Sequence, residues 1–106
     1  MNPNIKDKWV EALCSGKYKQ GVHTLRNKKD EYCCLGVLCD ITNPKEWSDS
    51  TIMPLQYYRM QGEGGQLPTK IMNEVGLTLQ DCKTLVNLND GGRSFSEIAD
   101  YIETNL

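Results

Sequence analysis

The sequence predicts a single α+β domain over residues 1–106 that is mainly helical. Apolar residues recur at helical spacing in both terminal regions, whereas β-branched and aromatic residues around a polar turn replace that period between them. The length of 106 residues is that of one domain, and 39% hydrophobic with 25% charged residues is a globular composition. We expect an amino-terminal helix, a small β-hairpin, a short buried helix and a carboxy-terminal cluster of three short helices.

The first helix is predicted over residues 3–15. Asn2 is a suitable N-cap, and Pro3 lies in the first turn, where its missing N–H costs nothing. Gly16 supplies the left-handed stop. The apolar face of this helix is formed by Ile5, Trp9, Ala12 and Leu13.

A small β-hairpin is predicted next. Residues 17–26 lose the helical period and gain β-branched and aromatic side chains. Residues 27–30 form a polar turn, and residues 31–33 follow as the second strand.

Residues 33–41 are apolar almost all round, and periodicity alone does not separate a short buried helix from a buried strand in such a run. We favour a central helix over residues 34–41. Gly36 would then allow another element to approach closely. Residues 42–67 contain prolines, glycines and no sustained period, so we expect loops there, with short strands near Ile52–Met53 and Gln66–Leu67.

Three short helices are predicted in the carboxy-terminal half. Pro68 opens the first, which Gly76 closes. Thr78 caps the second, with Asp81 three residues on, and residues 89–92 end it. The third begins at the capping box of residues 94–97.

The five cysteines are Cys14, Cys33, Cys34, Cys39 and Cys82. Their odd number and mostly apolar neighbours predict buried, reduced thiols and a cytoplasmic protein. The longest apolar run, residues 33–39, is far shorter than the ~20 residues of a membrane helix. No secretion signal is evident in residues 2–9, so we expect no membrane association.

Two chemical alternatives remain open. His23, the one histidine, and the cysteines have the side-chain types of a zinc or thiol-dependent enzyme, but paired Cys-x-x-Cys spacing is missing, so we expect no metal and no cofactor. Residues 1–31 carry seven basic and four acidic residues, which leaves nucleic-acid binding through the basic amino-terminal third open. Residues 95–102 resemble the first helix of a helix-turn-helix, but no recognition helix follows them.

The candidate ligand-binding residues lie on the predicted hairpin. Alternate strand residues share a face, and these offer charge, stacking and hydrogen bonds to an anionic or planar ligand. They are Lys17, Tyr18, Gln20 and Arg26. Since no complete catalytic constellation is evident, the sequence favours a non-enzymatic binder of a macromolecule or a small anionic ligand. It leaves the oligomeric state open.

Several segments together resemble a family of small uncharacterised proteins encoded by tailed bacteriophages and prophages. They are residues 8–13, 15–21, 25–26, 32–40, 88–90 and 95–99. The Cys-Cys-Leu-Gly-Val-Leu-Cys run at 33–39 is the most distinctive. The resemblance implies a phage origin and the host cytoplasm, so that a macromolecular partner would be a host macromolecule. It carries over no functional residues.

Overall fold

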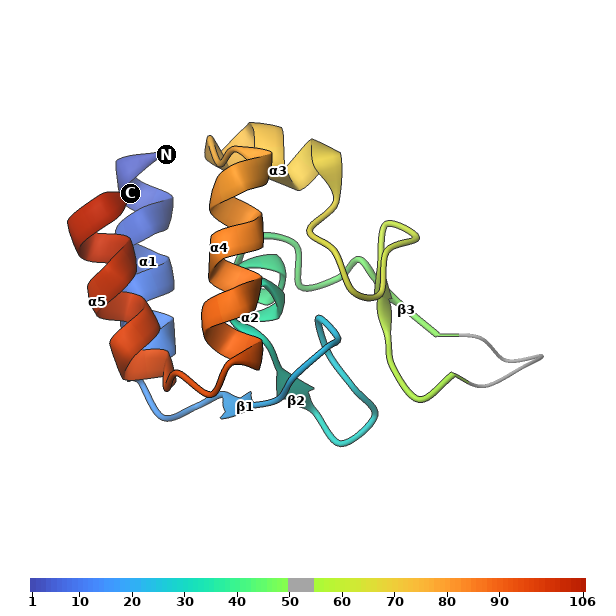
Figure 1. Ribbon diagram of the computed structural model, residues 1–106. Helices are drawn as coiled ribbons and strands as arrows, with labels where there is room; N and C mark the ends of the chain where they lie inside the picture. Colours follow the sequence, from blue (N-terminus) through green and yellow to red (C-terminus); the bar gives the residue numbers. More distant parts are fainter. Residues whose placement is uncertain (50–54) are drawn as a thin grey trace.

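The computed structural model describes residues 1–49 and 55–106 and confirms the predicted class, a mainly helical α+β domain (Figure 1). Helices α1 and α5 lie side by side, α4 packs beside α5, and α2 packs against both α1 and α4. The five helices of the described residues are α1 (Pro3–Cys14), α2 (Cys34–Thr42), α3 (Thr69–Val75), α4 (Leu79–Asp90) and α5 (Phe95–Asn105). The four short strands are β1 (Lys19–Gln20), β2 (Glu31–Tyr32), β3 (Trp47–Ser48) and β4 (Arg59–Met60).

The predicted helix starts and stops are confirmed to within one or two residues. The side-chain oxygen of Asn2 accepts hydrogen bonds from the first turn of α1. Capping boxes begin α4 at Thr78 and α5 at Ser94. Gly76 ends α3 in the left-handed conformation, with φ of 79°. Local hydrogen bonds therefore fix these boundaries, which is why a local pattern predicts them.

The run at residues 33–41 is a helix, as favoured. Residues 33–39 are buried, Ile41 is partly buried, and α2 lies at the centre of the core. Trp9 of α1 donates its indole N–H to the carbonyl oxygen of Cys34 at 2.9 Å. A Cβ atom on Gly36 would lie 1.7 Å from the carbonyl oxygen of Leu25, so the predicted close approach at this glycine is confirmed.

The predicted hairpin is wrong in its pairing, because β1 and β2 are parallel. Antiparallel pairing is limited to the end beside the turn, where Arg26 opposes Tyr32. The chain reverses between β1 and Arg26 through His23, whose φ is 71°, and the backbone N–H of His23 donates to Asp90 of α4 at 3.1 Å. This reversal carries β1 to the opposite edge of β2 from Arg26.

The loop expectation for residues 42–67 needs two further corrections. Strands β3 and β4 form an antiparallel pair within this segment, and no strand occurs at Gln66–Leu67. Leu67 is instead buried in the core just before α3, and Pro68 beside it has no N–H to pair. The strand expected at Ile52–Met53 lies outside the described residues.

Asn89 joins the helices to the loops. It is 1% exposed and is the one polar residue in the buried set of the described chain. Its amide donates to the carbonyl oxygen of Gly21 at 2.8 Å, and its side-chain oxygen accepts from the backbone N–H of Cys34 at 3.2 Å. The same oxygen accepts from the amide of Gln20 at 3.0 Å.

The cysteines are free thiols, and four of them are buried as expected. Cys14, at the last residue of α1, is exposed, so the expectation of a buried thiol is wrong there. It falls outside the helix stripe that Trp9 and Leu13 present to the core. Within the described residues, no helix has the length and apolar character needed to cross a bilayer.

Candidate functional site

Only two of the four predicted site residues meet at a common side chain in the structure. Tyr18 and Arg26 both contact Tyr32: the rings of Tyr18 and Tyr32 meet edge to face at 5.0 Å, and the Arg26 guanidinium lies 5.4 Å from the Tyr32 ring centre. Gln20 belongs elsewhere, since its amide donates to Asn89 and to the carbonyl oxygen of Arg93 at 2.7 Å. Lys17 is exposed in the turn after α1. Their role in ligand binding stays a prediction.

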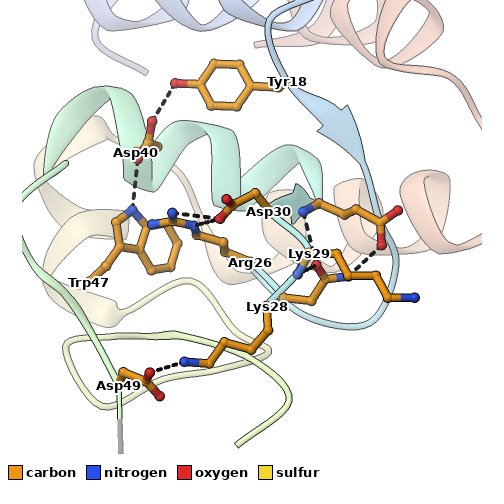
Figure 2. A network of polar contacts seen from close by, with 10 residues as sticks. Tyr18, Arg26, Lys28, Lys29, Asp30, Asp40, Trp47 and Asp49 are labelled. Carbon is orange, nitrogen blue, oxygen red and sulfur yellow. Dashed lines mark hydrogen bonds and ion pairs between the residues drawn. The ribbon is translucent and has the colours of Figure 1, made fainter.

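Arg26 sits in a cage of aromatic rings. Its guanidinium carbon lies 4.3 Å from the ring centre of Tyr58 and 5.5 Å from that of Trp47. Asp30 accepts from Nη2 at 2.7 Å and from Nε at 2.9 Å (Figure 2). Burial opposes the charge and is the largest single effect, yet the hydrogen bond and charge of Asp30 together with Tyr32 and Tyr58 outweigh it, so the pKa of Arg26 is raised. The guanidinium is therefore a permanent, oriented cation.

Asp40, at the end of α2, orients two rings of this network. Its carboxylate accepts from the Tyr18 hydroxyl at 2.6 Å and from the Trp47 indole N–H at 2.9 Å (Figure 2). Burial, together with the bond to Asp40, raises the pKa of Tyr18, so the phenol stays a neutral donor. Sequence reasoning missed Asp40, Trp47 and Tyr58. The one available signal was the concentration of aromatic residues in a segment with no period.

A second cation shares the Tyr58 ring. The ammonium of Lys28 lies 4.1 Å from that ring centre and pairs with Asp49 (Figure 2). Beside it is a cavity of about 270 Å³. Its lining residues are mostly polar or charged: Val22, Thr24, Asn27, Lys28, Lys29, Glu31, Gln56 and Tyr57. Bonds from Asn27 and Lys19 lower the pKa of Glu31, the one acid of this lining.

A separate cavity of about 110 Å³ brings together the residues of the enzymatic alternative. His23, Cys33 and Asp90 line it, and Nδ1 of His23 lies 3.4 Å from a carboxylate oxygen of Asp90. Cys33 precedes α2, and its Sγ accepts from the backbone N–H of Gly36 at 3.4 Å.

This second arrangement has the chemistry of a structural site. Burial raises the pKa of Cys33 to about 11, which keeps the thiol neutral near pH 7. The backbone N–H groups of Cys33 and Cys34 donate to Leu25 and Asn89, so they are committed rather than free to stabilise an oxyanion. Across residues 1–49 and 55–106, no group of three or more His, Cys, Asp or Glu side chains could hold a metal ion.

A family model described as a domain of unknown function (DUF8296) matches residues 1–106, and the chain belongs to this family. Comparisons with curated proteins and with solved structures gave no match. The family description assigns no activity, so a function has to be argued from the side chains themselves.

Proposed function

We propose that this protein is a non-enzymatic binding protein, encoded by a tailed phage or prophage and acting in the host cytoplasm, that binds a small anionic ligand beside Arg26 and Lys28. The observation that carries the proposal is that both cations lie over the ring of Tyr58. The resemblance to a phage family and the thiol-rich composition support the origin and compartment.

The cations are less exposed than their charge partners. Side-chain exposure is 20% for Arg26 and 27% for Lys28, but 62% for Asp30 and 43% for Asp49. An ion pair to an exposed carboxylate contributes about 1 kcal/mol or less. A ligand anion can therefore replace these carboxylates while the rings keep the cations in place.

The neighbouring cavity sets the ligand's size and polarity. Its volume of about 270 Å³ lies just below the ~300–1,000 Å³ usual for small-molecule sites. Lys28 and Lys29 supply positive charge, and Thr24, Asn27 and Gln56 supply hydrogen-bonding groups. These features suit a compact ligand such as a pyrophosphate or a tricarboxylate.

Nucleic-acid binding has less support from the same surface. Asp30, Glu31 and Asp49 alternate with the basic side chains and pair with them. A site that follows a phosphate backbone needs a continuous row of cations. The surface therefore suits one compact anion better than a polyanion.

The test is an NMR titration of isotopically labelled protein, with pyrophosphate and citrate as probes. We expect saturable shifts of the backbone amides of Thr24, Gln56 and residues 27–29, which weaken as salt rises. Replacing Lys28 and Lys29 together by Gln should weaken binding tenfold or more. Lys8→Gln, an exposed cation on α1, is the matched control and should change nothing.

Two results would reject the proposal. Linear, unsaturated shifts spread over the surface would mean that the anions bind nowhere in particular. Tighter binding of a random-sequence DNA duplex than of either probe, with a steep salt dependence, would favour the nucleic-acid alternative instead.

A further inference from the structure

A cavity of about 340 Å³ lies at α4, formed by different residues from the anion surface around Arg26. The helix contributes one wall, the loop at residues 65–67 contributes another, and Leu35 of α2 contributes from the core. Most of its side chains are apolar. The lining residues are Leu35, Gly65, Gln66, Leu67, Met72, Leu79, Cys82, Lys83, Val86 and Asn87.

The cavity leaves apolar surface in contact with water. Leu79 is 58% exposed. It is one of the two large hydrophobic side chains that are exposed among the described residues. Cys82 adds an uncharged sulfur, because burial raises the pKa of its thiol to about 11. A concave, apolar lining of this kind is what a small ligand's hydrocarbon portion requires.

The cavity lining also contains polar groups, which would contact a polar end of a ligand. Lys83 is the one charged residue among the described lining, and no other described residue forms an ion pair with it. Gln66 and Asn87 add side-chain amides, which can donate hydrogen bonds. An unpaired cation beside an apolar cavity is complementary to an anionic group attached to an apolar one.

We infer that this cavity binds a small amphiphilic anion, a short aliphatic chain or single aromatic ring that ends in a carboxylate. The apolar part contacts Leu35, Leu67 and Val86, and the carboxylate pairs with Lys83. A partner helix is a poorer fit, because helix-in-groove binding uses a row of anchors along several turns, whereas these side chains converge on one concavity. The inference is independent of the proposed function, since the two cavities share no residue.

The experiment measures binding of butanoate, hexanoate and octanoate by calorimetry, with octylammonium as the charge-reversed probe. Affinity should rise by about fourfold for each added methylene until the cavity is full. Octanoate should bind more tightly than octylammonium. Lys83→Gln should remove that preference, whereas Lys45→Gln, an exposed cation after α2, should preserve it.

NMR mapping on the unaltered protein decides the location without any variant. Octanoate should shift the backbone amides of residues 65–67 and 82–87. Val86→Trp, which fills the cavity, should then abolish binding if it folds. The inference is overturned if affinity is independent of chain length, if Lys83→Gln and Lys45→Gln behave alike, or if the shifts lie elsewhere. It is also overturned if the protein dimerises through Leu79, so that Leu79→Glu yields a monomer while octanoate does not bind.

Discussion

The helical region, formed by α1, α2, α4 and α5, and the loop region, formed by residues 15–33, 43–49 and 55–67, obtain their order in different ways. In the helical region, backbone groups bond within four residues, and caps such as Ser94, which begins α5, satisfy the helix termini locally. In the loop region, strands are two residues long, and side chains from distant positions hold the backbone. The side chain of Asn89 by itself satisfies the carbonyl oxygen of Gly21 and the N–H of Cys34.

The two regions also differ in how far their side chains are exposed. Most apolar side chains of the helical region lie in the core, with Leu79 of α4 as the exposed exception, and the helix termini are closed by their own caps. The loop region leaves Arg26, Lys28 and Tyr58 half-buried, with both cations over the Tyr58 ring. Loops on a rigid scaffold are where binding residues are usually found. Substitutions should therefore divide into those that unfold the scaffold and those that disturb only the loops.

Thiol labelling should give the largest contrast. At pH 8 the exposed Cys14 should react at the rate of a free thiol. The four buried cysteines should react more slowly by a factor on the order of 10³ or larger. Labelling with a chromogenic disulfide reagent, with and without denaturant, measures both rates. Rapid labelling of a second thiol in the native protein would contradict the core described above.

Gly36→Ala should be the most destabilising single substitution, because the added methyl would overlap the backbone of Leu25 where the two regions meet. We expect a loss of about 3 kcal/mol or more of unfolding free energy. Chemical denaturation measures it. Gly65→Ala is the matched control, since its Cβ would meet its nearest atom at 3.4 Å, and it should cost little.

Asn89→Ala should cut the link between the regions while leaving the helices intact. The N–H of Cys34 and the carbonyl of Gly21 would lose their partner, at a cost of about 2–3 kcal/mol. Amide hydrogen exchange should accelerate around residues 19–33 more than in α5. Asn87→Ala, an exposed neighbour on the same helix, is the control. Equal exchange rates in both variants would mean that Asn89 does not hold the loops.

Ser94→Ala should cost on the order of 1 kcal/mol, because the hydroxyl accepts from the backbone N–H of Glu97 at 3.2 Å. Thermal or chemical denaturation detects the loss. The effect stays within the helical region, so exchange in the loops should be unchanged. A denaturation midpoint that does not move when Ser94 and Glu97 are both replaced by Ala would contradict the capping role.

The smallest effect should be a pH dependence at Glu97. The backbone N–H of Ser94, with Arg93 and the Ser94 hydroxyl, lowers the pKa of this carboxyl below its ordinary 4.5. A lowered pKa contributes stability above the ordinary value, and the contribution is lost as pH falls through the folded-state value. Glu97→Gln should therefore be less stable than the unaltered protein at pH 7, and the difference should shrink as pH falls below the ordinary 4.5 and the carboxyl becomes protonated in the folded protein. Glu103→Gln, which removes an exposed charge late in α5, is the matched control for stability at pH 7.

Features of the helical region could be predicted from the sequence, whereas the strand pairing of the loop region could not. The pair of Ser94 and Glu97 predicts a helix start because both partners lie within one turn. No local pattern gives the parallel pairing of β1 and β2, because Gln20 is fixed by Asn89, 69 residues away. Alternation also failed for Tyr18 and Gln20, since β1 begins only at Lys19.

Only some residues of the candidate site could be named from the sequence, because the others come from distant segments. Arg26 and Tyr18 stand out by residue type, but their partners Asp40, Trp47 and Tyr58 come from three other segments. Only the path of the chain brings these groups together. Lys28, Lys29 and the cavity beside them were likewise missed, because a cavity depends on the neighbouring segment at residues 56–57.

The contact between α1 and α5 determines when the protein can fold during synthesis. The two helices pack along each other, and the ammonium of Lys6 donates to the carbonyl oxygen of Glu103 at 3.2 Å (Figure 1). In a nascent chain that ends at α4, the part of the apolar face of α1 that packs against α5 stays exposed to solvent. Contacts so distant in sequence slow folding and expose partly made chains to aggregation. Native structure in this protein is therefore completed only after α5 has left the ribosome.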